Sequence, residues 1–203
     1  MRGIIFSYQV FGLIIRATTK EKLILLLISH LKSNNRATFT QLNSYSINNL
    51  PVMTSIELEN IKLELQKVSN LRGESLQKLV VTLLDQHISH YNWTGLYWMN
   101  DAKGRLELGA YTGAATDHTS IPYGRGICGQ VAVSGQTFEV PDVHAQDNYL
   151  ACSLATKSEM VVPIYSEEKL IGQIDIDSHE LDPFTALDHE LLEWTAAFIA
   201  ERL

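Results

Sequence analysis

The residues best suited to chemistry in this chain are its two cysteines, Cys128 and Cys152. Cys128 lies between glycines in the sequence GRGICG, and Cys152 follows 24 residues later in the polar sequence NYLACS. A cysteine can be an inert buried residue, a metal ligand or a redox-active thiol. Two cysteines are too few for a secreted scaffold built on disulfides, so the surrounding residues must distinguish these three roles.

Motifs for metal ions and nucleotides are weak. His118, Cys128, His144 and Cys152 are possible metal ligands, but no C-x-x-C or H-x-x-x-H spacing joins them, so we expect no metal site among them. GRGICG matches the dinucleotide fingerprint G-x-G-x-x-G by letter. It precedes only a short run of small residues instead of the long helix of a βαβ unit, so we expect its glycines to form a tight turn.

Carboxylates form the strongest polar pattern. In GQIDIDS, Asp175 and Asp177 alternate with Ile174 and Ile176, which places both aspartates on one face of a strand. Two carboxylates on one face repel each other unless a cation lies between them or they share a proton. The pair therefore marks either a solvated sheet face or an anchor for an ammonium group. Glu159, which begins the neighbouring strand, is expected to add a third carboxylate.

Two aromatic residues are predicted to share one strand face. Trp93 and Tyr97 are four residues apart in NWTGLYW, a spacing that suits either a hydrophobic core or the wall of a pocket. In a pocket, such rings can stack on a cation or on a polarizable sulfur group. Aromatic rings, carboxylates and a thiol together would suit a small, polar ligand that carries an amine.

The elements that must position these residues are helices and strands predicted within residues 53–203. The hydrophobic periodicity predicts helices over 55–70, 73–91, 126–135 and 182–203, and strands over 93–100, 105–113, 137–143, 158–166 and 169–178. Short turns between the strands and helices at the ends indicate an α+β domain, with an antiparallel sheet covered by helices on one face.

Helix caps and an apolar stripe support two of these helices. Thr54 or Ser55 can cap the first helix, and Thr185 stands three residues before Asp188 as in a capping box. The buried stripe of the last helix is predicted to contain Leu187, Leu191, Trp194, Ala197 and Phe198.

Composition divides the chain near Pro51–Met53. The 203 residues carry a net charge of −7, which argues against a nucleic-acid-binding surface. Residues 1–52 have a net charge of +5 and residues 53–203 a net charge of −12. We expect 1–52 to be a weakly structured N-terminal extension, a start-site artefact with Met53 as the true first residue, or a targeting or membrane-surface segment. We expect 53–203 to form a single domain.

The first 52 residues contain an apolar run that is too short to cross a bilayer. GIIFSYQVFGLII has 13 residues, whereas a membrane-spanning helix needs about 20. EKLILLLISHLK has the spacing of one amphipathic helix, and an Asn/Ser-rich linker follows it. No membrane association and no function are assigned to this part of the chain.

Residues from about 70 to 203 resemble GAF domains and, more narrowly, the free methionine-(R)-sulfoxide reductases. The matching sequences occur in the family's order and are WTGLY, IPYGRGICG, DVHAQDNYLACS, SEMVVPI, GQIDIDS and FTALDHELL. The resemblance implies a GAF/PAS-like central antiparallel β-sheet flanked by helices. It also implies a cytoplasmic enzyme without a bound cofactor that reduces the sulfoxide of free methionine.

The resemblance implies roles for individual residues. Cys152 would attack the sulfoxide sulfur and become a sulfenic acid, which would be resolved to a disulfide and reduced by thioredoxin. Cys128 matches a second family cysteine. Residues implied to contact the substrate are Trp93 and Tyr97 as an aromatic wall, and Glu159, Asp175 and Asp177 as acidic groups that bind the substrate and help to protonate the departing oxygen.

His118 is a departure from the family pattern, because a third cysteine commonly occupies this position. Either Cys128 resolves Cys152 directly, or an external thiol does so, or turnover is lost and the domain is a non-catalytic module that binds a small molecule or senses redox state. His118 would lower the pKa of Cys152 if it lay near the pocket, or it is a surface loop residue. A homodimer through the helix IELENIKLELQKV is plausible, as GAF domains often pair through terminal helices.

Overall fold

The computed structural model describes residues 6–10, 13–17, 53–68, 70–150, 153 and 155–203. The chain divides into two compact units, Met1–Leu50 and Pro51–Leu203. In the first unit, β1 (Phe6–Val10) and β2 (Leu13–Ala17) pair in antiparallel orientation. The described residues of the apolar run, 6–10 and 13–15, therefore lie in paired β-strands. The helix predicted within EKLILLLISHLK lies outside the described residues.

The second unit contains a six-stranded sheet with the order β5-β4-β3-β8-β7-β6, and neighbouring strands are antiparallel. Its strands are β3 (Trp93–Asn100), β4 (Arg105–Thr112), β5 (Ser120–Pro122), β6 (Phe138–Val140), β7 (Ser158–Ser166) and β8 (Lys169–Ser178). The predicted hairpins β3–β4 and β7–β8 are confirmed. Sequence analysis missed β5, which has only three residues.

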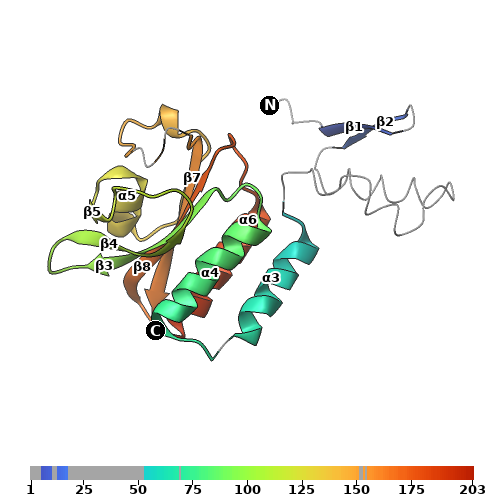
Figure 1. Cartoon of the computed structure of the whole chain (residues 1–203). Helices are drawn as coiled ribbons and strands as arrows, with labels where there is room; N and C mark the ends of the chain where they lie inside the picture. The colour runs from blue at the N-terminus through green and yellow to red at the C-terminus, as the bar shows by residue number, and fades with distance from the viewer. Residues whose placement is uncertain (1–5, 11–12, 18–52, 69, 151–152, 154) are drawn as a thin grey trace. The chain divides into compact units, whose positions relative to one another are not determined.

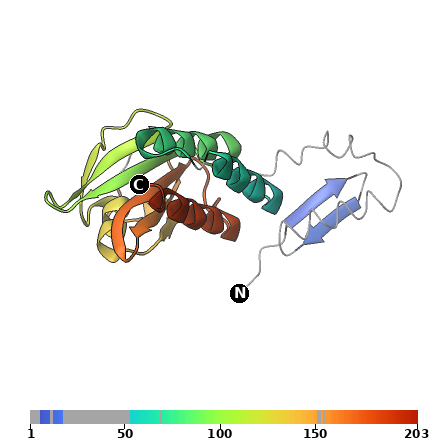
Figure 2. The same cartoon turned by 90° about the horizontal axis from the view of Figure 1, so that it is seen from below.

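Helices cover both faces of this sheet. The helices are α3 (Ser55–Lys67), α4 (Gly73–His87), α5 (Gly126–Ser134) and α6 (Ala186–Ala200). Figure 1 shows α3, α4 and α6 on one side of the sheet and α5 on the other, and Figure 2 shows the same layers from below. The expectation of helices on one face is therefore wrong for α5. No described helix is long and apolar enough to cross a membrane.

Two hydrophobic clusters sandwich the sheet, because its side chains alternate between its faces. The larger cluster lies between the sheet and helices α3, α4 and α6, and it contains Leu96, Ile174 and Ile176. The smaller cluster contains Trp93, Tyr97 and other residues of the face that α5 covers. The central strands β3 and β8 are thus buried on both sides, so polar residues on them are also removed from water.

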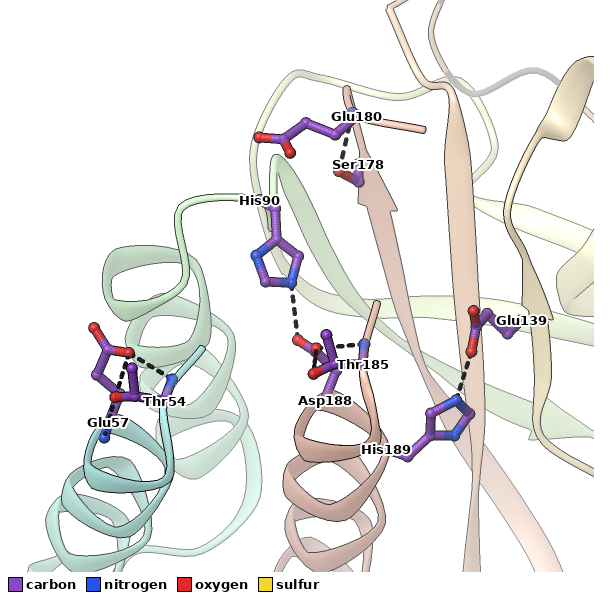
Figure 3. Close-up of polar contacts among 9 residues, drawn as sticks. All are labelled: Thr54, Glu57, His90, Glu139, Ser178, Glu180, Thr185, Asp188 and His189. Carbon is purple, nitrogen blue, oxygen red and sulfur yellow. Dashed lines mark hydrogen bonds and ion pairs between the residues drawn. The ribbon is translucent and has the colours of Figure 1, made fainter. Parts of the chain in front are cut away.

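Two capping boxes fix the starts of α3 and α6 (Figure 3). The box at Thr185 and Asp188 was predicted, and of the two candidate caps of α3 the structure uses Thr54. Thr54 donates its backbone N–H to Glu57 Oε2 at 2.7 Å and accepts the Glu57 N–H at 3.3 Å. Thr185 donates both its backbone N–H and its hydroxyl to Asp188 Oδ2, each at 2.7 Å. These bonds satisfy N–H groups that have no partner within the helix itself.

The buried stripes of the helices differ in part from the prediction. Ala197 is exposed, and the buried side of α6 is formed by Leu191, Leu192, Thr195, Ala196, Phe198 and Ile199. On α3, Leu58, Ile61 and Leu65 are buried, whereas Ile56 and Leu63 remain 75% and 52% exposed. Periodicity predicted both helices but not how far each is rotated against the sheet.

A buried polar pair joins α6 to the loop before β3. His90 and Asp188 are both fully buried, and His90 Nε2 lies 2.8 Å from Asp188 Oδ1 (Figure 3). Burial alone would raise the pKa of Asp188, but the hydrogen bonds and charge of His90, together with the bonds from Thr185, lower it below its ordinary value. Asp188 therefore acts as a helix cap and as a tether at once.

Replacing this tether should destabilise the domain strongly. We expect Asp188→Asn to lower the free energy of unfolding by about 3 kcal/mol, because the amide keeps one acceptor oxygen and turns a buried NH2 group toward either Thr185 or His90 in place of the other oxygen. Urea denaturation followed by circular dichroism measures this change. Glu193→Gln is the matched control, since Glu193 is exposed on the same helix. Equal stability of the two variants would contradict the structural role of Asp188.

Candidate active site

The antiparallel register brings the predicted site residues into two cross-strand rows. Trp93 of β3 lies opposite Asp177 of β8, which lies opposite Glu159 of β7. In the next row on the same face, Asp175 has Gly95 as its partner on β3. Directly opposite side chains have Cβ atoms about 5 Å apart, so the carboxylates and the indole form one continuous patch.

The three carboxylates of this patch are buried. The exposed fractions are 4% for Glu159, 1% for Asp175 and 2% for Asp177, so the alternative of a solvated sheet face is wrong. Asp175 Oδ1 and Asp177 Oδ1 have no hydrogen-bond partner among the described residues. Buried polar atoms usually have partners, and unpartnered ones mark places where a ligand can supply the missing bond.

Burial raises the pKa values of these three acids above the usual range for carboxyl groups. Desolvation raises the pKa of Asp175 to about 7, although a hydrogen bond with Cys128 opposes the shift. Desolvation and then the charges of Asp175 and Asp177 raise the pKa of Glu159 well above its ordinary value. Desolvation and the charge of Asp175 do the same for Asp177. Glu159, Asp175 and Asp177 therefore keep their protons to a higher pH than exposed carboxyl groups do.

Helix α5 brings a thiol to these acids. Cys128 is buried in the first turn of α5, and its thiol donates to Glu159 Oε1 at 3.9 Å. The Cys128 sulfur and one carboxylate oxygen each of Glu159 and Asp175 all lie within 4.8 Å of one another. The packing of α5 on β7 and β8 thus brings Cys128 close to two of the acidic residues.

The glycines around Cys128 make the tight turn that the sequence predicted. Gly124 and Gly126 have φ values of +80° and +66°, which glycine adopts without strain. At Gly129, an added Cβ would lie 2.6 Å from the carbonyl oxygen of Pro122. These glycines let the chain turn directly from β5 into α5 and hold the helix close to the strand.

Asn148 fastens the following loop to this turn. Its side chain accepts from the Gly126 N–H at 3.3 Å and donates to the Gly124 carbonyl at 2.9 Å. Leu150 packs against Gly126 of this turn, since an added Cβ at Gly126 would lie 2.9 Å from the Leu150 Cβ. Cys152, the predicted nucleophile, lies outside the described residues.

Aromatic rings border the acidic patch. The rings of Trp93 and Tyr97 have centroids 6.3 Å apart, so both predicted residues lie on the face that α5 covers. Trp93 also stacks on Tyr111 at 5.6 Å and donates its indole N–H to the Ala114 carbonyl. A Cβ on Gly95 would lie 2.2 Å from the Trp93 ring, so this glycine makes room for the indole.

Tyr97 connects the patch to the loop that carries His118. The Tyr97 hydroxyl donates to the backbone carbonyl of His118 at 2.8 Å, and the His118 N–H donates to Thr116 Oγ1 at 3.1 Å. The segment between β4 and β5 is therefore bound to the aromatic side of the patch. The predicted role of His118 as an auxiliary group stays a prediction.

Several residues of the site were not singled out from the sequence. Gln173 continues the alternation of Asp175 and Asp177, is fully buried, and has no partner among the described residues for either polar side-chain atom. The alternation with a period of two in GQIDIDS is the signal that could have placed Gln173 on this face. Asn92 brackets the end of β8, donating to the Asp177 carbonyl at 2.9 Å and accepting from the His179 N–H at 2.7 Å. No local sequence signal marks that role.

Comparison with known proteins identifies the fold family. The GAF domain family model matches residues 73–203. The chain belongs to the GAF domain family, among the free methionine-R-sulfoxide reductases. A protein of that name from Escherichia coli (strain K12) is 36% identical over 115 residues, which are 57% of this chain and 68% of the relative.

Further relatives of this GAF domain agree. Free methionine-R-sulfoxide reductase from Saccharomyces cerevisiae is 39% identical over 110 residues, which are 53% of this chain and 61% of the relative. A crystal structure of free methionine-R-sulfoxide reductase from Neisseria meningitidis in complex with its substrate superposes with a TM-score of 0.68. It is 28% identical, and the match covers 74% of this chain and 91% of that one.

The acids of this GAF domain should make its stability depend on pH. The folded-state pKa of Asp175 is raised to about 7, above its value in the unfolded chain, so the contribution of Asp175 to stability is complete below about pH 4 and is lost as pH rises through about 7. For Asp175, the loss is on the order of 4 kcal/mol. We expect the free energy of unfolding from urea titrations to fall between pH 5 and pH 8.

Asp175→Asn is the variant that tests the cause. An amide cannot ionise, so the fall in stability with pH should be reduced in this variant. Glu168→Gln removes an exposed carboxylate and should leave the pH dependence unchanged. The same slope in Asp175→Asn and the unsubstituted chain would show that Asp175 does not carry this dependence.

Proposed function

We propose that the chain catalyses thiol-dependent reduction of free L-methionine-(R)-S-oxide to methionine. The proposal rests on the buried patch. In it, three protonatable carboxyl groups and an indole lie on one sheet face, and the thiol of Cys128 on α5 packs against them. Such a patch combines the proton supply and the apolar wall that sulfoxide reduction needs. The names of the relatives support the same substrate.

The proposed first step is an attack of the Cys152 thiolate on the sulfoxide sulfur. One proton is taken up, the sulfur–oxygen bond of the substrate breaks, and the oxygen is transferred to Cys152 as a sulfenic acid. The substrate sulfur gains two electrons and the cysteine sulfur loses two. Described neighbours support this role, because Asn148 and Leu150 hold the preceding segment against the turn that leads to Cys128.

The carboxyl groups supply the proton and receive the amino group. Burial raises the pKa values of Glu159 and Asp177 well above the ordinary range, so each holds its proton to a higher pH than an exposed carboxyl group does and can donate it to the sulfoxide oxygen. Asp175, with a pKa raised to about 7, is the acid that ionises most readily. We assign it to the ammonium group of the substrate, whose charge would favour its ionised form.

The aromatic residues provide the apolar wall. Trp93 lies in the same cross-strand row as Asp177 and Glu159, so a methyl sulfoxide that reaches those acids would meet the indole face. Aromatic rings attract polarizable sulfur groups at about 5 Å. Tyr97 supports the indole and holds the His118 loop in place.

Recycling of the sulfenic acid is proposed to use Cys128. The thiol of Cys128 condenses with the Cys152 sulfenic acid, forming a disulfide and releasing water, and two electrons from thioredoxin restore both thiols. Cys128 would thereby take the role of the family's third cysteine, whose position is occupied by His118 in this chain. A cytoplasmic site of action is part of this proposal, since thioredoxin keeps thiols reduced in that compartment.

Self-association is proposed through α3. Ile56 and Leu63 are exposed and seven residues apart, so they lie on one face of the helix. Pairing of two such helices would remove both side chains from water.

The second candidate function is a non-catalytic GAF module that binds a small molecule or senses redox state. The histidine at position 118 favours this alternative, because it removes a thiol that the family commonly uses. The buried and unpartnered oxygens of Asp175 and Asp177 suit ligand binding with or without turnover.

The deciding experiment measures methionine formed from free methionine-(R)-sulfoxide by the full chain, with dithiothreitol or with thioredoxin. We expect Cys152→Ser to abolish product formation, since the nucleophile is lost. Cys128→Ser should still form one methionine per chain, but its multiple turnover with thioredoxin should fall at least tenfold. Product at the normal rate from Cys152→Ser would refute the mechanism. A folded, reduced chain with no turnover under either reductant would favour the binding module.

Gly95→Ala tests the aromatic wall. The added Cβ would overlap the Trp93 ring and displace it, so we expect kcat/KM to fall at least tenfold while the fold is retained. Gly104→Ala is the control, because a Cβ there meets nothing within 4 Å although the glycine has a positive φ. Equal kcat/KM for the two variants would show that the indole position does not matter.

A further inference from the structure

The strongest unassigned feature is the group formed by Cys128, Glu159 and Asp175. Each of these buried residues offers one ligand atom, and the three atoms lie within 4.8 Å of one another. The Cys128 sulfur is 3.9 Å from Glu159 Oε1. They come from three separate elements, α5, β7 and β8, so no spacing in the sequence marks them as a set.

This geometry is close to that of a three-ligand metal site. In tetrahedral zinc coordination, with bonds of about 2.3 Å to sulfur and about 2.1 Å to oxygen, ligand atoms are about 3.5 Å apart. Small side-chain rotations would close the present separations to that value. A thiolate with two carboxylates leaves a fourth position open, as in sites with three protein ligands.

A second observation points to a ligand at the same place. Asp175 Oδ1 and Asp177 Oδ1 are buried without partners among the described residues, and so is the Gln173 amide two positions before Asp175 on the same face. In the described part of the chain, no Lys, Arg or His side chain forms an ion pair with Glu159, Asp175 or Asp177. Buried carboxylates need either protons or a cation to balance their charge, and a metal ion can take the place of the protons.

We propose that Cys128, Glu159 and Asp175 bind one thiophilic divalent cation, of the Zn²⁺ or Cd²⁺ type, and that this ion excludes the amine-bearing substrate from the patch. The sequence-based expectation of no metal site concerned His118, Cys128, His144 and Cys152, which are a different set. The exclusion of substrate rests on the proposed function, whereas the binding of the metal does not. The bound ion would hold the site inactive and protect its thiol from oxidation.

Cadmium titration of the full chain tests the site directly. In a reduced, metal-free Cys152→Ser chain, Cys128 is the single thiol, so ultraviolet thiolate-to-cadmium absorption reports on it alone. We expect one Cd²⁺ per chain. Glu159→Gln or Asp175→Asn in this background should weaken binding at least tenfold, and Glu168→Gln should leave it unchanged. Circular dichroism verifies that each variant is folded.

Two outcomes would overturn the proposal. An absence of the absorption band would exclude a cadmium thiolate at Cys128. Equal affinity in Glu159→Gln, Asp175→Asn and the Cys152→Ser parent would show binding by an isolated thiol. Competition in the Cys152→Ser chain, which cannot reduce the substrate, then tests exclusion, since methionine sulfoxide should raise the apparent Kd of Zn²⁺ in a calorimetric titration. An unchanged Kd would refute exclusion, and none of these measurements requires turnover.

Discussion

The register of β3, β8 and β7 is the constraint on which the site depends. It places Trp93, Asp177 and Glu159 in one row and Asp175 in the next, on a face that α5 then covers. A slip of one residue in any of these strands would turn its polar side chains into the other hydrophobic cluster. Chemistry and folding are therefore specified by the same hydrogen-bond ladder.

The opposite face of the sheet stabilises this arrangement. Buried acids without partners oppose folding, and the cluster beneath α3, α4 and α6 must offset their cost. The polar tethers lie at the ends of the strands: His90 joins Asp188 in front of β3, and Asn92 joins the backbone on both sides of Ser178. These bonds engage the backbone at the strand ends, and one carboxyl oxygen each of Asp175 and Asp177 stays available to a ligand.

Local patterns predicted most of the strands and helices, but not that α5 covers the second face of the sheet. Alternation in GQIDIDS and the four-residue spacing of Trp93 and Tyr97 correctly assigned residues to one strand face, and the capping signals at Thr54 and Thr185 located two helix starts. The position of α5 on the second face follows from glycine contacts that link β5 to the helix, and these contacts have no periodic signal. For this reason, the sequence left open whether the aspartates are solvated, and it missed the burial of Gln173. The role of Cys152 rests on resemblance and stays a prediction.

The raised pKa values connect the possible occupants of the patch. A protonated acid, a substrate ammonium group and a divalent ion each remove the same unfavourable buried charge, so they compete for the same carboxylates. Protons suit catalysis because a sulfoxide oxygen can take them up. An ammonium group replaces the proton only at the acid that ionises most readily, which is Asp175. A thiophilic ion is favoured over both only where a thiol lies among the acids, and the first turn of α5 places Cys128 there.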